Sequence, residues 1–221
     1  MPQTTHTVGT STYERMKRDV ISGALAPGAK LKLEALRERY GASVSTLREI
    51  LNRLASEGFV AAAEQRGFFV TPVSTADLIE IAELRILLEC TALEASIAAG
   101  DADWEGRVVA AHHKLHRMEQ KMLAGDVAQR ALWKRYDWEF HQALVSACHS
   151  RNLLALHGTI FDKYLRYQML VLTYRGAPAV ADHKLMLEAA LARDARAAVA
   201  ALEHHIRMGL AHAQAAMERP A

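Results

Sequence analysis

Asp137 and His141 are the residues of this chain whose types and spacing most directly suggest chemistry. They lie four positions apart in a stretch, 127–149, with helical periodicity, so an α-helix would place them on one face, one turn apart. Trp133 and Leu144 share that face, and we therefore expect the carboxylate and the imidazole to be buried. A divalent metal would offset the cost of burying them. The alternative is an ordinary hydrogen-bonded Asp–His pair in the core.

Two further histidines could complete a metal shell. His183 shares a helical face with Leu187, and His205 shares one with Leu202, so both are expected to point inward. His204 lies 100° further round the same helix and could take the place of His205. One carboxylate with three imidazoles suits Zn²⁺, and also Ni²⁺ or Mn²⁺.

The bulk composition is that of a folded chain with two modest domains. The 221 residues are 51% hydrophobic and 24% charged, which excludes a disordered protein. Residues 1–72 carry ten Lys/Arg against seven Asp/Glu, whereas residues 73–221 carry seventeen against eighteen. The basic excess therefore lies in the first third, which weakly favours nucleic acid as a partner there.

The cysteines and the N-terminus indicate a cytoplasmic protein. Cys90 and Cys148 are far apart, form no Cys-x-x-Cys pattern and fall on apolar helical faces, as expected of reduced thiols. The first ten residues lack the pattern of a secretion signal, and no apolar run approaches the roughly 18 residues that a membrane span requires. We expect no membrane association.

Three short helical patterns and one hairpin pattern fill the first third of the chain. Ser11 and Glu14 have the spacing of a capping box, and Ser43 is placed to cap the third helix. After a flexible arm at residues 1–10, we expect helices at 11–22, 33–40 and 44–57, and strands at 59–63 and 68–71. This order outlines a winged helix-turn-helix, whose helix after the tight turn enters the major groove of DNA. A small core without DNA-binding activity would show the same pattern.

From residue 73 onward the periodicity is helical throughout. The patterns span 76–99, 103–124, 127–149, 153–175, 179–193 and 195–217. We therefore predict a mainly α protein. A winged helix-turn-helix domain at 1–72 precedes an all-α bundle of six to seven helices at 73–221.

Residues 11–72 resemble the DNA-binding domain of the GntR family of bacterial transcription regulators. The matching residues are Leu47-Arg48-Glu49-Ile50-Leu51, Glu57-Gly58-Phe59-Val60 and Arg66-Gly67-Phe68-Phe69-Val70.

The resemblance implies a set of DNA contacts. They are Arg48 in the recognition helix, Ser45 and Thr46 on phosphates or base edges, and Arg66 and Gly67 in the wing. Arg37 is either a contact to the DNA backbone or a solvated helix charge. Val44 stands where the family usually has arginine, so the operator is expected to differ from the family's usual site.

Residues 76–212 resemble FCD, the ligand-binding domain of the FadR branch of the same family. The matching pieces are Glu83-Leu84-Arg85, Asp137-x-x-Phe140-His141, Asn152-Leu153-Leu154, His183-Lys184 and His205-Ile206. The resemblance implies that Asp137, His141, His183 and His205 bind a metal, and the His-Ile pairing favours His205 over His204. It also implies a small organic acid on the metal, with Arg85 and Asn152 as effector contacts. For Arg85, a buried ion pair with Glu89 or Glu94 is the alternative.

The resemblance therefore implies a homodimeric regulator that binds palindromic operator DNA and responds to a small carboxylate, with zinc favoured over nickel or manganese. A purely structural metal is one alternative. A metal-dependent hydrolase is another, but its obvious general base, Glu139, lies 200° from Asp137 on the helix, so we predict no enzyme. His112 and His116 have metal-capable spacing, yet the lysines and arginine around them favour a solvated face.

Overall fold

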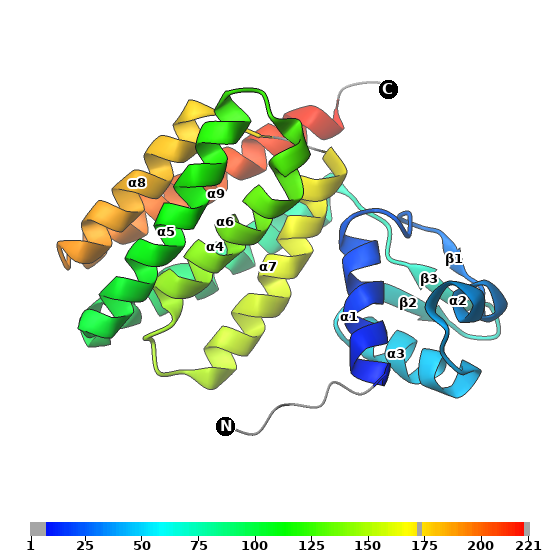
Figure 1. The fold of residues 1–221 in the computed structure, drawn as a ribbon. Coiled ribbons are helices and arrows are strands. Elements are labelled where there is room, and N and C mark those ends of the chain that lie inside the picture. Colours follow the sequence, from blue (N-terminus) through cyan, green and yellow to red (C-terminus); the bar gives the residue numbers. More distant parts are fainter. Residues whose placement is uncertain (1–7, 172–173, 219–221) are drawn as a thin grey trace. The chain divides into compact units, whose positions relative to one another are not determined.

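The computed structural model describes residues 8–171 and 174–218. Within them the chain forms two compact units, one made of residues 8–78 and 162–171, the other of residues 79–161 and 174–218. Figure 1 shows the order of their elements along the chain.

Three helices and a small sheet make up the N-terminal part of the first unit (Figure 1). They are α1 (Val8–Ile21), β1 (Lys30–Leu31), α2 (Leu33–Tyr40), α3 (Val44–Ser56), β2 (Val60–Ala63) and β3 (Gly67–Val70). The sheet is antiparallel in the order β1-β3-β2. Met16, Leu47, Leu51 and Phe59 are fully buried between the helices and the sheet. This is the predicted winged helix-turn-helix.

Two residues fix the tight turn between α2 and α3. Gly41 has a φ of 66°, in the left-handed region that favours glycine, and its N–H donates to the carbonyl of Arg37 at 2.9 Å. The Ser43 hydroxyl accepts from the backbone N–H of Thr46 at 3.2 Å and so caps α3. Helix α3 therefore begins at Val44, as its sequence predicts.

This part departs from the sequence-based prediction at two places. Helix α1 begins at Val8, so residues 8–10 are helical and do not belong to an arm; no proline there stops the helix. The rest of the predicted arm, residues 1–7, lies outside the described residues. Strand β1 is absent from the prediction, because two residues are too few for a periodic pattern and their partners, Phe68 and Phe69, are distant in sequence.

Six α-helices follow within the described residues, as the predicted bundle requires. They are α4 (Thr75–Ala99), α5 (Ala102–Leu123), α6 (Arg130–Val145), α7 (Arg151–Val171), α8 (Ala177–Leu191) and α9 (Ala195–Met217). The predicted single helix at 127–149 is shorter: a 3₁₀ turn, η1, covers Val127–Gln129, and α6 ends at Val145. His149 has a φ of 54°, which is incompatible with a continuing right-handed helix.

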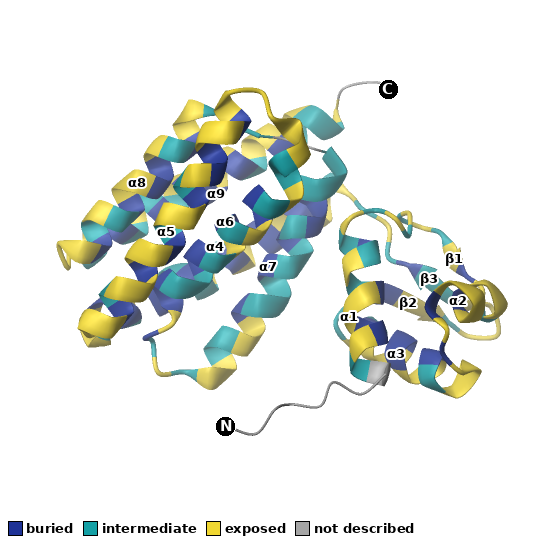
Figure 2. Cartoon of the chain, viewed as in Figure 1, coloured by how far each residue is buried: buried dark blue, intermediate teal, exposed yellow. Residues whose placement is uncertain are grey.

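The bundle helices bury one stripe each, and the residues outside the stripe are exposed or, along most of α7, half-buried (Figure 2). Trp104, Phe140, Met186 and Leu202 are fully buried, and the indole N–H of Trp104 donates to the carbonyl of Ala143 at 3.0 Å. None of the described helices is both long and apolar enough to cross a bilayer. Cys90 and Cys148 are free thiols, although both are half-buried rather than part of the core.

Candidate functional site

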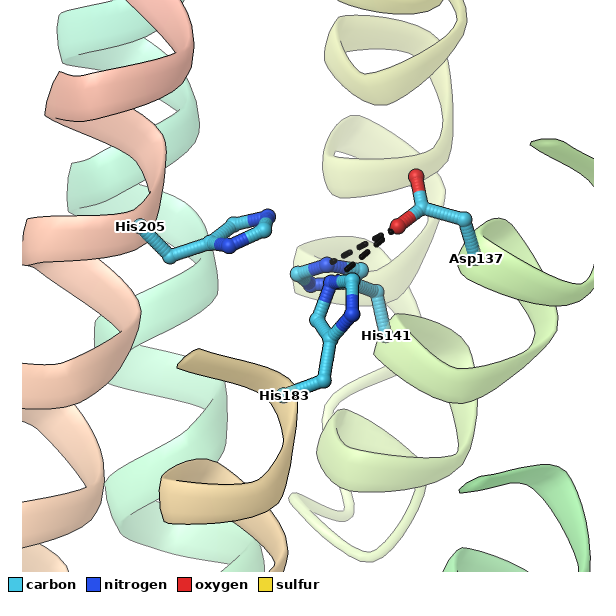
Figure 3. A group of neighbouring side chains, drawn as sticks. All are labelled: Asp137, His141, His183 and His205. Atoms are coloured by element: carbon cyan, nitrogen blue, oxygen red, sulfur yellow. Dashed lines mark ion pairs between the residues drawn. The ribbon is translucent and has the colours of Figure 1, made fainter. Parts of the chain in front are cut away.

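The four predicted metal ligands come together inside the helical bundle. Asp137 and His141 project from α6, His183 from α8 and His205 from α9, toward a common centre (Figure 3). Each offers one ligand atom, and these atoms all lie within 4.8 Å of one another. All four side chains are buried, with exposures between 0% and 7%.

Individual contacts in this quartet leave atoms facing the centre. Asp137 Oδ1 lies 3.3 Å from His183 Nε2 and 4.0 Å from His141 Nε2. The His183 Nε2 atom is buried yet makes no hydrogen bond of good geometry within the described part of the chain. A buried polar atom without a hydrogen bond is costly, and a metal ion at the centre would satisfy it.

The Nδ1 atom of each of the three histidines lies near a carboxylate. His183 Nδ1 lies 2.6 Å from Glu119 Oε1, and His141 Nδ1 is hydrogen-bonded to Glu89. His205 Nδ1 lies 3.3 Å from Asp182 Oδ2 but also 2.8 Å from the donor Arg175 Nη2, so the pairing with a carboxylate is clear only for His141 and His183. Metal-binding histidines ordinarily donate their second ring N–H to such a partner, which fixes the tautomer and presents the other nitrogen to the metal. The residues present therefore fit a metal.

Sequence reasoning did not find these three carboxylates as partners of the histidines. One signal was available for Glu119, because it occupies the apolar face of α5 together with Leu115 and Met122, all buried. An acidic residue on such a face needs a partner.

Most of the quartet is in the charge state that a metal requires, with an ionised carboxylate and neutral imidazoles. Burial by itself would raise the pKa of Asp137, but Lys134 and the neighbouring histidines hold it well below its ordinary value. Burial lowers the pKa of His141, and burial together with His183 lowers that of His205 well below its ordinary value.

His183 is the exception in this respect. Burial would lower its pKa, but the carboxylates of Asp137 and Glu119 on either side of the ring raise it. Metal binding at His183 therefore competes with a proton, and occupancy should weaken as the pH falls.

Arg85 lies beside the quartet and is already paired. Its Nε donates to Glu89 Oε2 at 2.8 Å, its Nη2 lies 3.2 Å from His141 Nδ1, and its guanidinium stacks 4.3 Å from the centre of the Phe161 ring. The ion pair with Glu89 is the alternative that the sequence offered. This ion pair holds the guanidinium next to His141, a candidate metal ligand. The contact of Arg85 with an effector stays a prediction.

Other candidates are placed differently. Asn152 is exposed in the first turn of α7 and is not among the side chains that converge on the quartet. Glu139 pairs with Lys114 at 3.2 Å and with Arg135 at 3.0 Å, on the surface of the bundle and away from Asp137. His112 was expected on a solvated face, but its ring packs edge-on against the buried Phe140 at 5.3 Å between ring centres.

The predicted DNA contacts lie on the surface of the first unit. Arg37, Ser45, Arg48, Arg66 and Gly67 are exposed, and Thr46 is half-buried at the N-terminal end of α3. Arg48 and Gly67 line one open hollow of about 370 Å³ between the recognition helix and the wing. Lys30 and Lys32, which sequence reasoning did not single out, line the same hollow and add positive charge.

Comparison with known proteins agrees with this fold. Residues 9–70 match the family of bacterial regulatory proteins, gntR family, and residues 80–208 match the FCD domain. The chain is 37% identical over 198 residues to the HTH-type transcriptional regulator BphR of Paraburkholderia xenovorans (strain LB400), covering 89% of this chain and 81% of BphR. It is 32% identical over 202 residues to the HTH-type transcriptional repressor GlaR of Escherichia coli (strain K12), covering 88% and 90%.

Solved structures show the same architecture. E. coli McbR/YncC aligns over 96% of this chain and 99% of its own, with a TM-score of 0.80 at 21% identity, a likeness in fold alone. The metal-free FCD domain of TM0439 aligns over 66% of this chain and 96% of its own, with a TM-score of 0.52 at 21% identity. With the family matches covering both parts of the chain, this protein belongs to the GntR family and is a DNA-binding transcription regulator with an FCD domain.

Proposed function

We propose that this regulator binds a divalent metal, preferably zinc, in its FCD domain. We further propose that a small carboxylate bound at this metal controls the affinity of the regulator for operator DNA. The observation that carries the proposal is the quartet's arrangement, in which four ligand atoms lie within 4.8 Å of one another and the Nδ1 atoms of His141 and His183 face carboxylates. Such pairing leaves the Nε2 atoms to a metal, and the FCD domain is a metal-binding fold. Four protein ligands fill the tetrahedral shell of zinc, so an external oxygen donor would bind as a fifth ligand to an expanded zinc shell, or directly to nickel or manganese, which accept more ligands.

Arg85 would receive the effector. A guanidinium pairs well with a carboxylate in two parallel hydrogen bonds, and Arg85 lies next to His141. To do so it would exchange part of its contact with Glu89 for the incoming acid. If that pair does not open, the metal is purely structural, which is the second candidate role and is favoured by the existing Arg85–Glu89 bond.

We propose DNA contacts from α3 and the wing. Arg48 would read base edges, the hydroxyls of Ser45 and Thr46 would contact phosphates or base edges, and Arg66-Gly67 would follow the backbone or the minor groove. Exposure of these residues supports this assignment. Arg37 is a further candidate for a backbone contact. The proposed domain boundary stays at residue 72, between the two family matches.

The regulator is proposed to act in the cytoplasm as a homodimer on a palindromic operator, since two-fold symmetric proteins read two-fold symmetric sites. GntR regulators commonly dimerise. The apolar side chains of Leu84 and Leu87 on α4 are 44% and 63% exposed, as expected of a face that a second copy covers. The effector would shift DNA binding only by binding one arrangement of the dimer better than the other.

Selection of binding sites from a randomised duplex library tests the DNA half of the proposal. We expect the enriched sequences to contain an inverted repeat, and binding followed by fluorescence anisotropy to weaken steeply with salt. Arg48→Ala should weaken operator binding by about 5- to 150-fold, the equivalent of about 1–3 kcal/mol. Arg196→Ala, an exposed arginine on α9, is the matched control and should bind like the native chain. A library that enriches no sequence would overturn this half.

A further inference from the structure

A second group of metal-capable side chains lies on α5, outside the quartet. His112, His116 and Glu119 are spaced by four and three residues, so they share one face of the helix within about 60°. The side chain of His116 is 45% exposed, whereas that of Glu119 is fully buried. The group therefore runs from the surface of the bundle inward.

The two oxygens of the Glu119 carboxylate face different partners. Oε1 lies 2.6 Å from Nδ1 of His183, so this oxygen is the partner of a quartet residue. Oε2 is buried and makes no hydrogen bond within the described residues, although it lies 3.7 Å from His116 Nδ1. A buried carboxylate oxygen without a hydrogen bond calls for a cation.

His112 supplies a second buried atom of this kind. Its Nε2 is buried and has no hydrogen-bond partner in the described part of the chain. The His112 and His116 rings are nearly parallel, with an interplanar angle of 11° and 6.0 Å between their centres, and Phe140 closes the inner side of His112. Two unsatisfied buried atoms on one helix face thus adjoin a half-exposed imidazole.

We propose that His112, His116 and Glu119 form a second, outer site for a divalent transition metal of the zinc class. Ligand atoms about 2.0–2.1 Å from a tetrahedral zinc lie roughly 3.4 Å apart, close to the 3.7 Å between His116 Nδ1 and Glu119 Oε2. A turn of the His112 ring would supply the third ligand, and solvent at the exposed edge would supply the fourth. Two imidazoles with one carboxylate is a donor set of open zinc sites.

This site goes beyond the proposed function, because none of its three residues belongs to the quartet. The two sites are linked only by the Glu119 carboxylate, whose Oε1 is the partner of His183 and whose Oε2 would bind the outer metal. The outer site is also the more accessible of the two, since its His116 is half-exposed whereas the quartet is buried.

Metal stoichiometry of the full-length chain, prepared without a histidine tag, tests the proposal. The protein is stripped with chelator, dialysed to equilibrium against buffered free zinc and analysed for zinc per chain. We expect two zinc ions in the native chain and one in His116→Ala. The exposed neighbour His113 provides the matched control, and His113→Ala should still bind two. His205→Ala should lose the inner ion and keep the outer one.

The outcomes separate the two sites. One zinc in the native chain, with its loss in His205→Ala and its retention in His116→Ala, would overturn the outer site and leave the quartet standing. Equal zinc content in His116→Ala and the native chain would also overturn it, because His116 would then carry no ion. No zinc in the native chain would overturn both sites.

Discussion

The histidines of the quartet owe their orientation to acidic partners on other helices. Asp182 Oδ2 lies 3.3 Å from His205 Nδ1 and accepts from Arg175 at 3.1 Å, while Arg175 Nη2 also lies 2.8 Å from His205 Nδ1. Such partners fix the imidazole tautomer and raise its basicity, so their loss ordinarily lowers metal affinity by about 10- to 100-fold.

Asp182→Asn should therefore weaken zinc binding at the inner site by about 10- to 100-fold with little change in fold, because asparagine has the same shape. Competition with a chromogenic chelator measures the affinity. Glu203→Gln, an acidic residue of α9 bonded to Arg207 on the surface, is the matched control. Unchanged affinity in Asp182→Asn would mean that the carboxylate does not position His205.

The stability of the metal-free chain should fall as the pH drops below about 6.5, the ordinary pKa of histidine. Burial holds the pKa of His205 well below that value and lowers that of His141, so below pH 6.5 the unfolded chain takes up protons that the folded chain does not. The stability is thus complete above the unfolded pKa and is lost as the pH falls toward the folded pKa. His183, whose pKa is raised, acts in the opposite direction.

Melting temperatures of chelator-treated protein between pH 7.5 and 5.5 measure this effect by circular dichroism. The decrease should be smaller in His205→Gln, which cannot take up the proton. An identical decrease in both chains would remove His205 as its source.

The convergence of the quartet could be predicted because Asp137 and His141 are one helical turn apart and because His183 and His205 lie on apolar helical faces. The FCD resemblance favoured His205 over His204 and implied that the four residues bind a metal. Its acidic partners could not be predicted from spacing. Glu89 lies 52 residues from His141, and Glu119 lies 64 residues from His183. Such pairings depend on how the helices pack, and a single sequence does not record that packing.

At the scale of elements, most helix ends could be predicted from capping residues and from helix-terminating residues such as glycine. Helix α3 begins after Ser43 and α9 after Asp194, whose side chain accepts from the N–H of Ala197 at 2.9 Å. The misjudged elements are those whose limits depend on distant partners or on an unusual backbone angle, as with β1 and with the end of α6 before His149.

The junction between α4 and α5 depends on a close approach at Gly100. A Cβ atom there would lie 2.4 Å from Cε3 of the buried Trp104 and 2.8 Å from the carbonyl oxygen of Ser96. Gly100→Ala should therefore lower the free energy of unfolding by about 1–3 kcal/mol through overpacking.

Gly106→Ala is the matched control. Gly106 lies inside α5, and a Cβ atom added to it would have no neighbour within 4 Å, so alanine should raise the free energy of unfolding by about 0.5–1 kcal/mol. Urea denaturation measures both changes. A Gly100→Ala chain as stable as the native one would contradict the packing described for this junction.

At the scale of the whole molecule, the chain joins a basic DNA-binding part to an FCD domain with a buried metal-capable quartet. The family explains the pairing of the two parts, and the quartet is the metal site that we propose for the second part. An effector that binds the folded chain and not the unfolded one stabilises it by an amount that grows with the logarithm of the effector concentration above Kd, so its binding can be measured without knowledge of the operator.

A thermal-shift screen of small carboxylates, with added zinc and again after chelator, is the sharpest test of a metal-bound effector. At a hundredfold excess over its Kd, a specific acid should stabilise by about 2.7 kcal/mol, a shift of several degrees for a chain of this size. We expect at least one acid whose shift disappears with chelator, in Asp137→Asn and in Arg85→Lys. A shift that persists without metal, or stabilisation by zinc with no response to any carboxylate, would show that the metal does not hold the effector.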